Sequence, residues 1–342
     1  MTNATPFRIA INGYGRIGQC VLRALYENGY RDHLQVVAIN ELSDIDTIAH
    51  LTKYDSTHGR FHGEVAVDGD NLVVNGDRIR VLRHPEPEEL PWRLLDVDLV
   101  LECSGAYSDR ATAEKHIEAG AQRLLFSQPG DPDVDRTVVF GINDGDLNGQ
   151  DVIVAAGSCT TNCLVPVIKV LDDAFGVEQG STTTIHAAMN DQPVIDAYHH
   201  QDLRRTRSAL HNIVPVDTGL ARGIERLLPN MEGRFSSVAM RVPTLNVSAI
   251  DMVVNVREPT DIATVNQLLC GASAGSLKGI LGYTDELLAS SDFNHDFHSG
   301  VVDGGQTRVT GGTMVKVLCW FDNEWGFANR MLDVSRTWLS KT

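Results

Sequence analysis

The chain has 342 residues, of which 42% are hydrophobic and 22% charged, and its formal net charge is -16. This length is enough for two domains with separate cores. The acidic balance disfavours electrostatic capture of nucleic acid, and no apolar run approaches the ~20 residues of a membrane span. The six cysteines form no C-x-x-C pair, so we expect free thiols in a reducing compartment and no metal site.

The first predicted strand runs straight into a glycine-rich turn. The sequence begins MTNATPFRIA, which is polar until it enters this strand. We therefore expect no signal peptide and a cytoplasmic protein. Residues 9–18 read IAINGYGRIG, and a helical pattern of apolar residues follows. Glycines at this spacing permit a tight turn and the close approach of a pyrophosphate, which the N-terminus of the helix then binds. The predicted cofactor-binding residues here are Gly13, Gly15, Arg16, Ile17 and Gly18.

A second apolar strand, residues 34–40, ends at Glu41, about 20 residues past the last glycine of the turn. An acidic side chain at this place can accept a hydrogen bond from the ribose 2′-hydroxyl of a dinucleotide. No arginine follows to hold a 2′-phosphate, so NAD is favoured over NADP. The alternative is that Glu41 caps the next helix.

From residue 8 to residue 156, apolar strands alternate with helical patterns, the rhythm of a parallel, doubly wound sheet. Ligands of such sheets bind beyond the carboxyl ends of the strands, so Ser127, just past a strand, is expected near the dinucleotide. Two of the strands form a small antiparallel insertion across a turn at Asn75-Gly76. The expected strands are residues 8–12, 34–40, 71–74, 78–82, 99–103, 123–126, 137–140 and 152–156.

The run AAGSCTTNC, residues 155–163, puts Cys159 where a strand turns into an amphipathic helix. The free N–H groups and the positive dipole end of a helix stabilise a thiolate, so we expect a lowered pKa and a nucleophile. A buried free cysteine is the plainer alternative. Cys163, one turn further along the same helix face, fits that plainer role.

The second half of the chain carries longer alternating runs. Residues 180–187, 237–242, 248–257 and 313–322 predict antiparallel strands with one face covered. Residues 325–339 have a helical period, and we expect this helix to return to the first domain.

Several motifs, in their order and spacing, resemble the glyceraldehyde-3-phosphate dehydrogenase family essentially end to end. They are INGYGRIG, YDSTHGRF (54–61), SCTTNC, H-x-x-x-NDQ (186–192), DLRRTR (202–207), RVPT-x-NVS (241–248) and WFDNEWGFANR (320–330). The resemblance and the patterns together predict an α/β fold. A doubly wound Rossmann-type NAD domain at 1–157 would be joined by a C-terminal helix at 324–342, and residues 158–323 would form an α+β catalytic domain with a mainly antiparallel sheet.

The resemblance implies that the protein is a homotetramer and that its substrate is a small phosphorylated aldose. We expect neither nucleic acid nor a membrane as a partner. Cys159 would attack the aldehyde, His186 would take the thiol proton, and Asn323 would orient the carboxamide of NAD. Arginine forks suit phosphate oxygens, although Arg204, Arg205 and Arg207 could also form a solvated or subunit-facing cluster. The predicted substrate-binding residues are Ser158, Thr160, Arg205, Thr218, Gly219 and Arg241.

Within the family, the chain looks more like the branch that oxidises erythrose 4-phosphate. In that branch water resolves the Cys159 thioester to 4-phosphoerythronate, which serves pyridoxal 5′-phosphate synthesis. The marks are INEL (39–42), Met189 where glycolytic members usually carry Thr, VIDAYH (194–199), IVPVDT (213–218), DFNHD-x-HS (292–299) and Phe327.

Some positions depart from that branch or from the family. Gly219 follows the glycolytic pattern, Ala156-Gly157 replaces the usual Asn and Ala, and the stretch His199-His200-Gln201 looks one residue longer than in relatives. A phosphorylating glyceraldehyde-3-phosphate dehydrogenase therefore stays an alternative. A second alternative is a dinucleotide sensor or RNA-binding protein without activity, against which the intact Cys159 and His186 and the acidic charge count.

Overall fold

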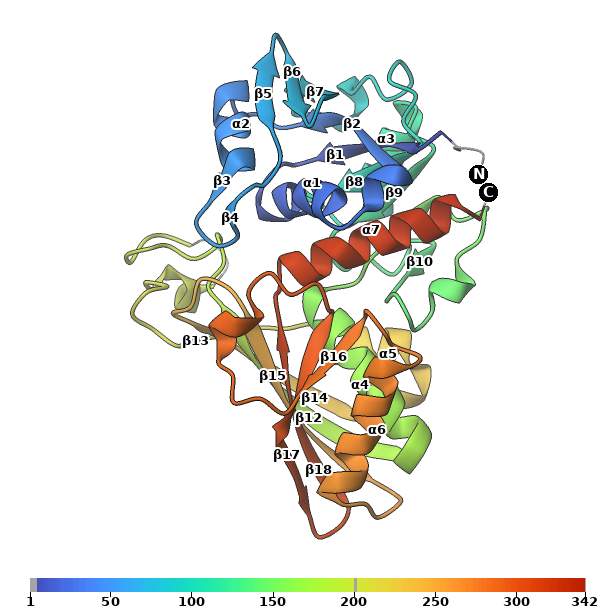
Figure 1. Ribbon diagram of the computed structural model, residues 1–342, viewed down its shortest axis with the longest axis vertical. Coiled ribbons are helices and arrows are strands. Elements are labelled where there is room, and N and C mark those ends of the chain that lie inside the picture. The colour runs from blue at the N-terminus through green and yellow to red at the C-terminus, as the bar shows by residue number, and fades with distance from the viewer. Residues whose placement is uncertain (1–4, 200–201, 342) are drawn as a thin grey trace. The chain divides into compact units, whose positions relative to one another are not determined.

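The computed structural model describes residues 5–199 and 202–341 (Figure 1). The chain divides into two compact units, the first comprising Met1–Ser158 with Ala328–Thr342 and the second Cys159–Phe327. Positions 200 and 201, where the sequence looks one residue longer, lie outside the described residues. Within the described ranges, no helix combines the length and the apolar character needed to cross a membrane.

The first unit is built on a nine-stranded sheet in the order β10-β11-β9-β8-β1-β2-β7-β6-β5. The pairs from β10 through to β7 are parallel, whereas β5–β6 and β6–β7 are antiparallel. The turn between β6 and β7 is at Asn75-Gly76, where both residues have positive φ. The predicted Rossmann-type sheet and its antiparallel insertion are therefore confirmed. The strands are β1 (Phe7–Asn12), β2 (Leu34–Asn40), β5 (Val65–Asp68), β6 (Asn71–Val74), β7 (Asp77–Leu82), β8 (Leu99–Glu102), β9 (Arg123–Phe126), β10 (Arg136–Thr137) and β11 (Ile153–Ala155).

Helices complete the first unit. They are α1 (Arg16–Glu27), α2 (Ile45–Lys53), α3 (Arg110–Glu118) and most of α7 (Trp325–Leu339), and a two-stranded ribbon of β3 (Tyr54–Asp55) and β4 (Gly59–Arg60) follows α2. The C-terminal helix is tied to the unit by hydrogen bonds. Tyr30 Oη donates to Asp333 Oδ1 at 3.0 Å, and Asn28 Nδ2 donates to Asn329 Oδ1 at 2.6 Å.

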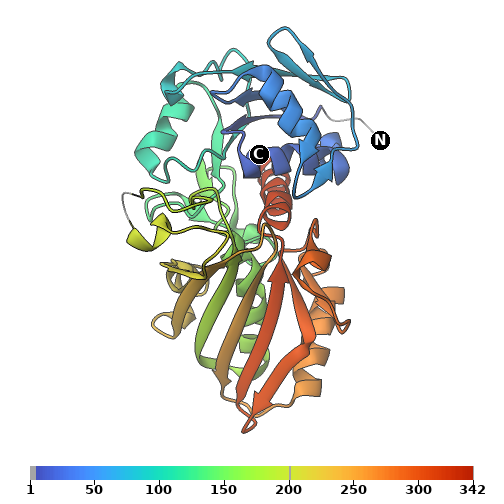
Figure 2. The same cartoon turned by 90° about the vertical axis from the view of Figure 1, so that its left-hand side faces the viewer.

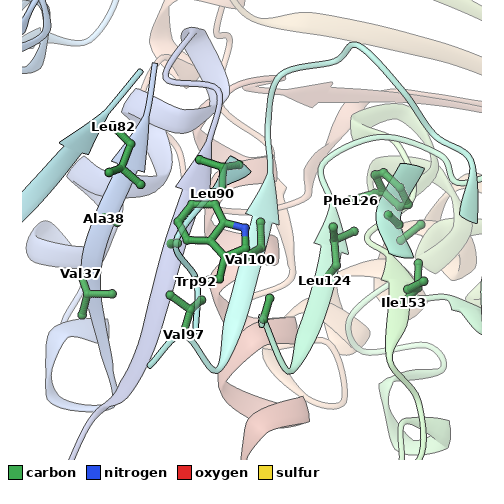
Figure 3. Packing of buried hydrophobic residues seen from close by; sticks show 14 of the residues in the cluster. Val37, Ala38, Leu82, Leu90, Trp92, Val97, Val100, Leu124, Phe126 and Ile153 are labelled. Carbon is green, nitrogen blue, oxygen red and sulfur yellow. The ribbon is translucent and has the colours of Figure 1, made fainter. Parts of the chain in front are cut away.

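A buried apolar cluster packs on the sheet of the first unit, with Trp92 wholly buried among Val97, Val100 and Leu90 (Figure 3). The polar end of Trp92 is also satisfied, because its Nε1–H donates to Nδ1 of the buried His116 at 3.0 Å. The opposite nitrogen of that ring lies 3.5 Å from Oε2 of Glu102, the last residue of β8. The core thus supports the carboxyl end of a central strand.

One expected strand of the first unit is wrong. Residues 137–140 were expected to be extended, but β10 stops at Thr137. The side chain of Asn143 closes a loop instead, since its Oδ1 accepts from the N–H of Val139 at 2.8 Å and its Nδ2 donates to the carbonyl of Thr137 at 2.9 Å. The N–H of Val138 still donates to the carbonyl of Ala155 in β11 at 2.8 Å, but Val139 is buried without strand pairing.

The second unit is built on a seven-stranded sheet in the order β13-β14-β12-β15-β18-β17-β16. Helices α4 (Cys159–Phe175), α5 (Leu220–Leu227) and α6 (Ile262–Ala274) lie on one face of it (Figures 1 and 2). In β15 and β18 buried residues alternate with half-buried ones, as expected for a sheet covered on one face. The strands are β12 (Val177–Ala187), β13 (Val214–Val216), β14 (Phe235–Val242), β15 (Ser248–Val256), β16 (Leu281–Thr284), β17 (Gly300–Thr310) and β18 (Met314–Phe321).

This sheet is mainly antiparallel, as predicted, but two of its pairs are parallel. The runs expected at 180–187 and 237–242 belong to β12 and β14, which pair side by side in the same direction, as do β16 and β17. The reason is the long connection between β12 and β14, which includes β13 and α5 and can carry the chain back to the same end of the sheet. Alternation shows which face of a strand is buried but not the direction of its neighbour.

Candidate active site

The three glycines of the turn between β1 and α1 have different roles. Gly13 has φ +86, and a Cβ there would lie 2.4 Å from the backbone of Ser104, so this position needs glycine for the turn and for close strand packing. A Cβ on Gly18 would lie 2.4 Å from the carbonyl oxygen of Gly13, which shows that α1 packs directly on the strand. A Cβ on Gly15 would meet nothing within 4 Å. Gly15 therefore keeps space open at the start of the helix.

That open space belongs to a cleft at the carboxyl ends of β1, β2 and β8, where dinucleotide sheets bind their ligand. Glu41 lies in it directly after β2. Its Oε2 accepts from the N–H of Tyr14 at 2.9 Å and its Oε1 from the N–H of Leu42 at 2.8 Å, so the carboxylate is fixed in the cleft. The helix that follows is capped by Asp44, so Glu41 is not its cap. The cleft is lined by Asn12, Gly13, Gly15, Asn40, Glu41, Leu42, His84, Pro85, Cys103, Ser104, Ala106 and Tyr107.

The other predicted cofactor residues of this unit do not line the cleft. Arg16 begins α1 and forms an ion pair with Asp55, and Ile17 follows it in the first turn. Ser127 follows β9 and donates its N–H to the carbonyl of Glu102 at 2.9 Å. Asn323 belongs to the second unit.

Sequence reasoning missed a buried polar network under the cleft. Glu102 accepts from the N–H of Ser104 at 2.8 Å and from Asn12 Nδ2 at 2.5 Å. Asn12 Oδ1 in turn accepts from Asn40 Nδ2 at 2.7 Å. Each of these polar residues ends an apolar strand or follows one. Polar residues at the ends of apolar strands were therefore the feature of the sequence that could have predicted this network.

Cys159 is the first residue of α4 and is partly exposed. The chain reaches it from β11 through Gly157, whose φ of +68 is the left-handed conformation that glycine adopts without cost. Glycine at this position, a departure from the family pattern, therefore suits the turn. The Sγ atom lies 3.8 Å from Nε2 of His186 near the end of β12, so the structure brings together the two residues predicted to be catalytic.

The orientation of the His186 ring is fixed by the backbone. Nδ1 lies 2.8 Å from the carbonyl oxygen of Ala187. Because a carbonyl oxygen only accepts, Nδ1 carries the proton, and in the neutral ring the lone pair of Nε2 faces the thiol. A base in contact with the thiol, oriented by a third group, is the arrangement that activates a nucleophile.

The expectation of a lowered thiol pKa is wrong. Burial raises the pKa of Cys159 to about 11, although the charge of Arg241 and the N–H of Thr160 both act to lower it. Burial, assisted by Arg241, lowers the pKa of His186 to about 4. The pair is therefore a neutral thiol and a neutral imidazole at neutral pH. The N-terminus of the helix opposes the cost of burying a thiolate but does not outweigh it.

Cys163 differs from Cys159 in its surroundings. It is wholly buried, and its Sγ would lie 2.7 Å from a Cβ built on Gly300. Burial and the neighbouring Cys319 thiol hold its pKa well above the usual range. These contacts are those of a packing residue.

Two of the predicted phosphate-binding arginines meet beside the His186 ring. Arg241 at the end of β14 is the register partner of His186, and its Nη1 lies 3.7 Å from Asp191 Oδ1. Arg205 Nη1 donates to the other oxygen of Asp191 at 3.1 Å. Asp191 was not predicted, although it stands in the NDQ motif. This carboxylate holds two cations close together.

Several polar atoms in the same region are buried without a hydrogen-bond partner among the described residues. They are Arg205 Nε, Arg241 Nη1, both amide atoms of Gln192, and Thr244 Oγ1. Arg205 Nε and Arg241 Nη1 each lie 3.7 Å from a carboxylate oxygen, of Asp202 and Asp191, which is an ion pair but not a hydrogen bond. Buried polar atoms nearly always form a hydrogen bond in a folded protein, so these atoms indicate a place for a ligand or water. Two guanidinium groups make an anion the fitting ligand.

The remaining predicted substrate residues lie in two places. Ser158 and Thr160 flank Cys159, while Thr218 and Gly219 precede α5, where Thr218 Oγ1 accepts from the N–H of Leu220 at 3.2 Å. Of the other two arginines, Arg207 is exposed and pairs with Asp196 at 2.8 Å, and Arg204 is exposed.

The arrangement can be compared with known protein families. The description "Glyceraldehyde 3-phosphate dehydrogenase, NAD binding domain" matches residues 7–110, and "Glyceraldehyde 3-phosphate dehydrogenase, C-terminal domain" matches residues 158–323. The two matches occur in the family's order and together span most of the sequence. The chain belongs to the glyceraldehyde-3-phosphate dehydrogenase family. It is an NAD-dependent dehydrogenase of this family, whose substrate is a phosphorylated aldehyde.

Family membership fits the open cleft of the first unit. The space that Gly15 leaves and the fixed Glu41 carboxylate suit the pyrophosphate and the ribose of NAD. The structure thus gives a physical reason for the glycine at position 15 and for the acidic residue that follows β2.

The contrast between two glycines yields a test. We expect Gly18→Ala to destabilise the protein by about 1–3 kcal/mol, the usual cost of overpacking, because its Cβ would clash with a carbonyl oxygen. Gly15→Ala should leave the melting temperature near that of the wild type but weaken NAD binding, measured by calorimetry. Equal stability of the two variants would contradict this account.

Arg241 yields a second test, in which the rate of Cys159 alkylation by iodoacetamide is measured. This reagent is neutral, so its reaction does not depend on a phosphate-binding site. Removing the charge in Arg241→Met should raise the pKa of Cys159 further and slow its alkylation several-fold at pH 8. The difference should shrink as the pH approaches 11, where the wild-type thiol itself ionises. Arg207→Met, which removes an exposed guanidinium, is the matched control. An unchanged rate in Arg241→Met would show that this charge does not act on the thiol.

Proposed function

We propose that the chain oxidises D-erythrose 4-phosphate to 4-phosphoerythronate, with NAD as oxidant and a thioester on Cys159 that water resolves. The observation that carries the covalent mechanism is the contact between Cys159 Sγ and the unprotonated Nε2 of His186 at 3.8 Å. A thiol with an oriented base beside it is suited to adding to an aldehyde carbon.

The residues of the chain divide the work as follows. His186 takes the thiol proton as the Cys159 sulfur attacks, because the raised pKa of the thiol leaves little free thiolate at neutral pH. The developing oxyanion is stabilised by backbone N–H groups at the start of α4 and by the protonated His186. The chemistry that bound NAD supplies is hydride acceptance, which oxidises the hemithioacetal on Cys159 to a thioester, and Asn323 would hold the NAD carboxamide.

Phosphate recognition is proposed for Arg205 and Arg241. The other residues proposed to bind the phosphate of the substrate, or the phosphate that attacks the thioester, are Ser158, Thr160, Thr218 and Gly219. Two observations support this assignment: both arginines contact Asp191, and each has a buried guanidinium nitrogen that forms no hydrogen bond within the described part of the chain. Among the three arginines of the DLRRTR motif, Arg205 is the one that is paired within this cluster.

The choice of water over inorganic phosphate rests on Met189. Its side chain is 45% exposed in the loop that follows β12 and precedes Asp191. Glycolytic members usually carry a threonine here, whose hydroxyl can donate to an anion, whereas a thioether cannot donate. The loss of one hydrogen bond to a charged group corresponds to about 1.5–3 kcal/mol, or roughly 10- to 100-fold in occupancy by attacking phosphate.

The second candidate is a phosphorylating glyceraldehyde-3-phosphate dehydrogenase. Gly219, which is exposed directly before α5, favours it, because this residue follows the glycolytic pattern. The shared thiol–imidazole pair serves either reaction equally well. The two candidates differ only in what attacks the thioester and in the length of the aldose.

We further propose a cytoplasmic homotetramer that serves pyridoxal 5′-phosphate synthesis. The six cysteines are all free, which suits a reducing compartment. Large apolar side chains are exposed in the loop after β12, among them Tyr198 at 99% and Leu203 at 83%. Large exposed apolar side chains of this kind support association with further copies.

The substrate proposal is tested by NADH formation with erythrose 4-phosphate and with glyceraldehyde 3-phosphate, each with and without inorganic phosphate. We expect erythrose 4-phosphate to be oxidised without added phosphate and to be preferred by kcat/KM. Met189→Thr should increase phosphate-dependent turnover, because it restores a donor to the anion subsite. A wild-type protein that requires phosphate and prefers glyceraldehyde 3-phosphate would establish the glycolytic candidate instead.

A further inference from the structure

A hydroxyl outside the predicted site connects two of its residues. Ser248, the first residue of β15, is 1% exposed. Its Oγ lies 2.8 Å from Oδ1 of Asn323, two residues past the end of β18, and 3.1 Å from the backbone nitrogen of Ala187, at the end of β12. Ser248 thus joins the end of the strand that carries His186 to the segment that carries Asn323.

The directions of these bonds follow from the atoms involved. The amide oxygen of Asn323 only accepts, so the single hydroxyl proton of Ser248 is donated to it. The N–H of Ala187 only donates, so it uses a lone pair of the same Oγ. Ser248 is therefore a full partner in both bonds, and an alanine at this position would leave both groups without one.

The consequence for Asn323 is a fixed amide. With Oδ1 held by Ser248, the amide must present Nδ2 on its other side. In the described part of the chain, Nδ2 donates to no other residue, although Asn323 as a whole is nearly buried. An N–H donor whose direction is fixed, and which donates to no other group of the described chain, is suited to bind an oxygen atom of a ligand.

The consequence for His186 runs through Ala187, the residue that Ser248 holds. Ala187 accepts from His186 Nδ1 with its carbonyl oxygen and donates to Ser248 with its N–H. The ring is also held by Phe321, with the two ring centroids 6.2 Å apart, and Phe321 is the register partner of Ser248. The catalytic base and the amide therefore share one support.

We propose that Ser248 is a positioning residue that aims the Asn323 amide donor at the carboxamide oxygen of the nicotinamide, while it holds Ala187, the residue whose carbonyl orients His186. The inference rests on the role proposed above for Asn323. It adds that the hydroxyl of Ser248 sets the direction of the Asn323 donor.

The test compares the binding of NAD with that of ADP-ribose, which lacks the nicotinamide, by isothermal titration calorimetry without any aldehyde. In Ser248→Ala the dissociation constant for NAD should rise about 2- to 10-fold, the value of one net hydrogen bond, while that for ADP-ribose should stay unchanged. A merely structural role would move both constants or neither. In the double variant with Asn323→Ala, NAD binding should be no weaker than in Asn323→Ala alone.

Thr182→Val is the matched control, because Thr182 is a wholly buried β12 residue whose hydroxyl donates to Ser237 at 2.9 Å, away from the ends of the strands. It should bind both ligands as the wild type does. Unchanged NAD affinity in Ser248→Ala, equal losses for both ligands, or independent effects of the two substitutions would overturn the inference. Failure of the substrate proposal is a separate result, since it would show as absent or phosphate-dependent turnover of erythrose 4-phosphate by the wild type.

Discussion

The hydrogen bond between Nδ1 of His186 and the carbonyl oxygen of Ala187 is the constraint on which the candidate site depends. It places the ring proton on the side away from Cys159 and leaves a lone pair facing the thiol at 3.8 Å. The opposite tautomer would present an N–H to the sulfur and could not accept its proton. The β12 strand end, α4 and the residues beneath the ring all serve to keep this one contact in place.

Electrostatics then decide how the contact is used. Burial favours the neutral form of both partners, because it raises the pKa of Cys159 and lowers that of His186. Arg241 lowers both values, so it favours a thiolate but disfavours an imidazolium beside it. In the proposed mechanism, proton transfer is consequently coupled to attack on the substrate. The same guanidinium pairs with Asp191 next to Arg205, which links the base to the region suited to an anionic substrate.

The sequence was most informative where a local pattern determines a local structure. The expected ranges of β2 and α7 match the observed ones, and the glycine turn and the Asn75-Gly76 hairpin lie where their composition placed them. It was least informative where distant residues decide the outcome. Nothing in a single strand reveals that β12 and β14 run parallel, that Asn143 ends β10, or that burial outweighs the helix dipole at Cys159. Asp191 and Ser248 are ordinary polar residues until the strands bring their partners to them.

The central claim is that oxidation passes through an acyl group bound to Cys159. Its most direct test is rapid-quench intact-protein mass spectrometry of the chain mixed with NAD and erythrose 4-phosphate within the first turnover. The account predicts one acyl group per chain, located on Cys159 by peptide mapping, formed together with NADH, absent in Cys159→Ser and retained in Cys163→Ser. Steady NADH production by Cys159→Ser, or an acyl group located on any other residue, would contradict it.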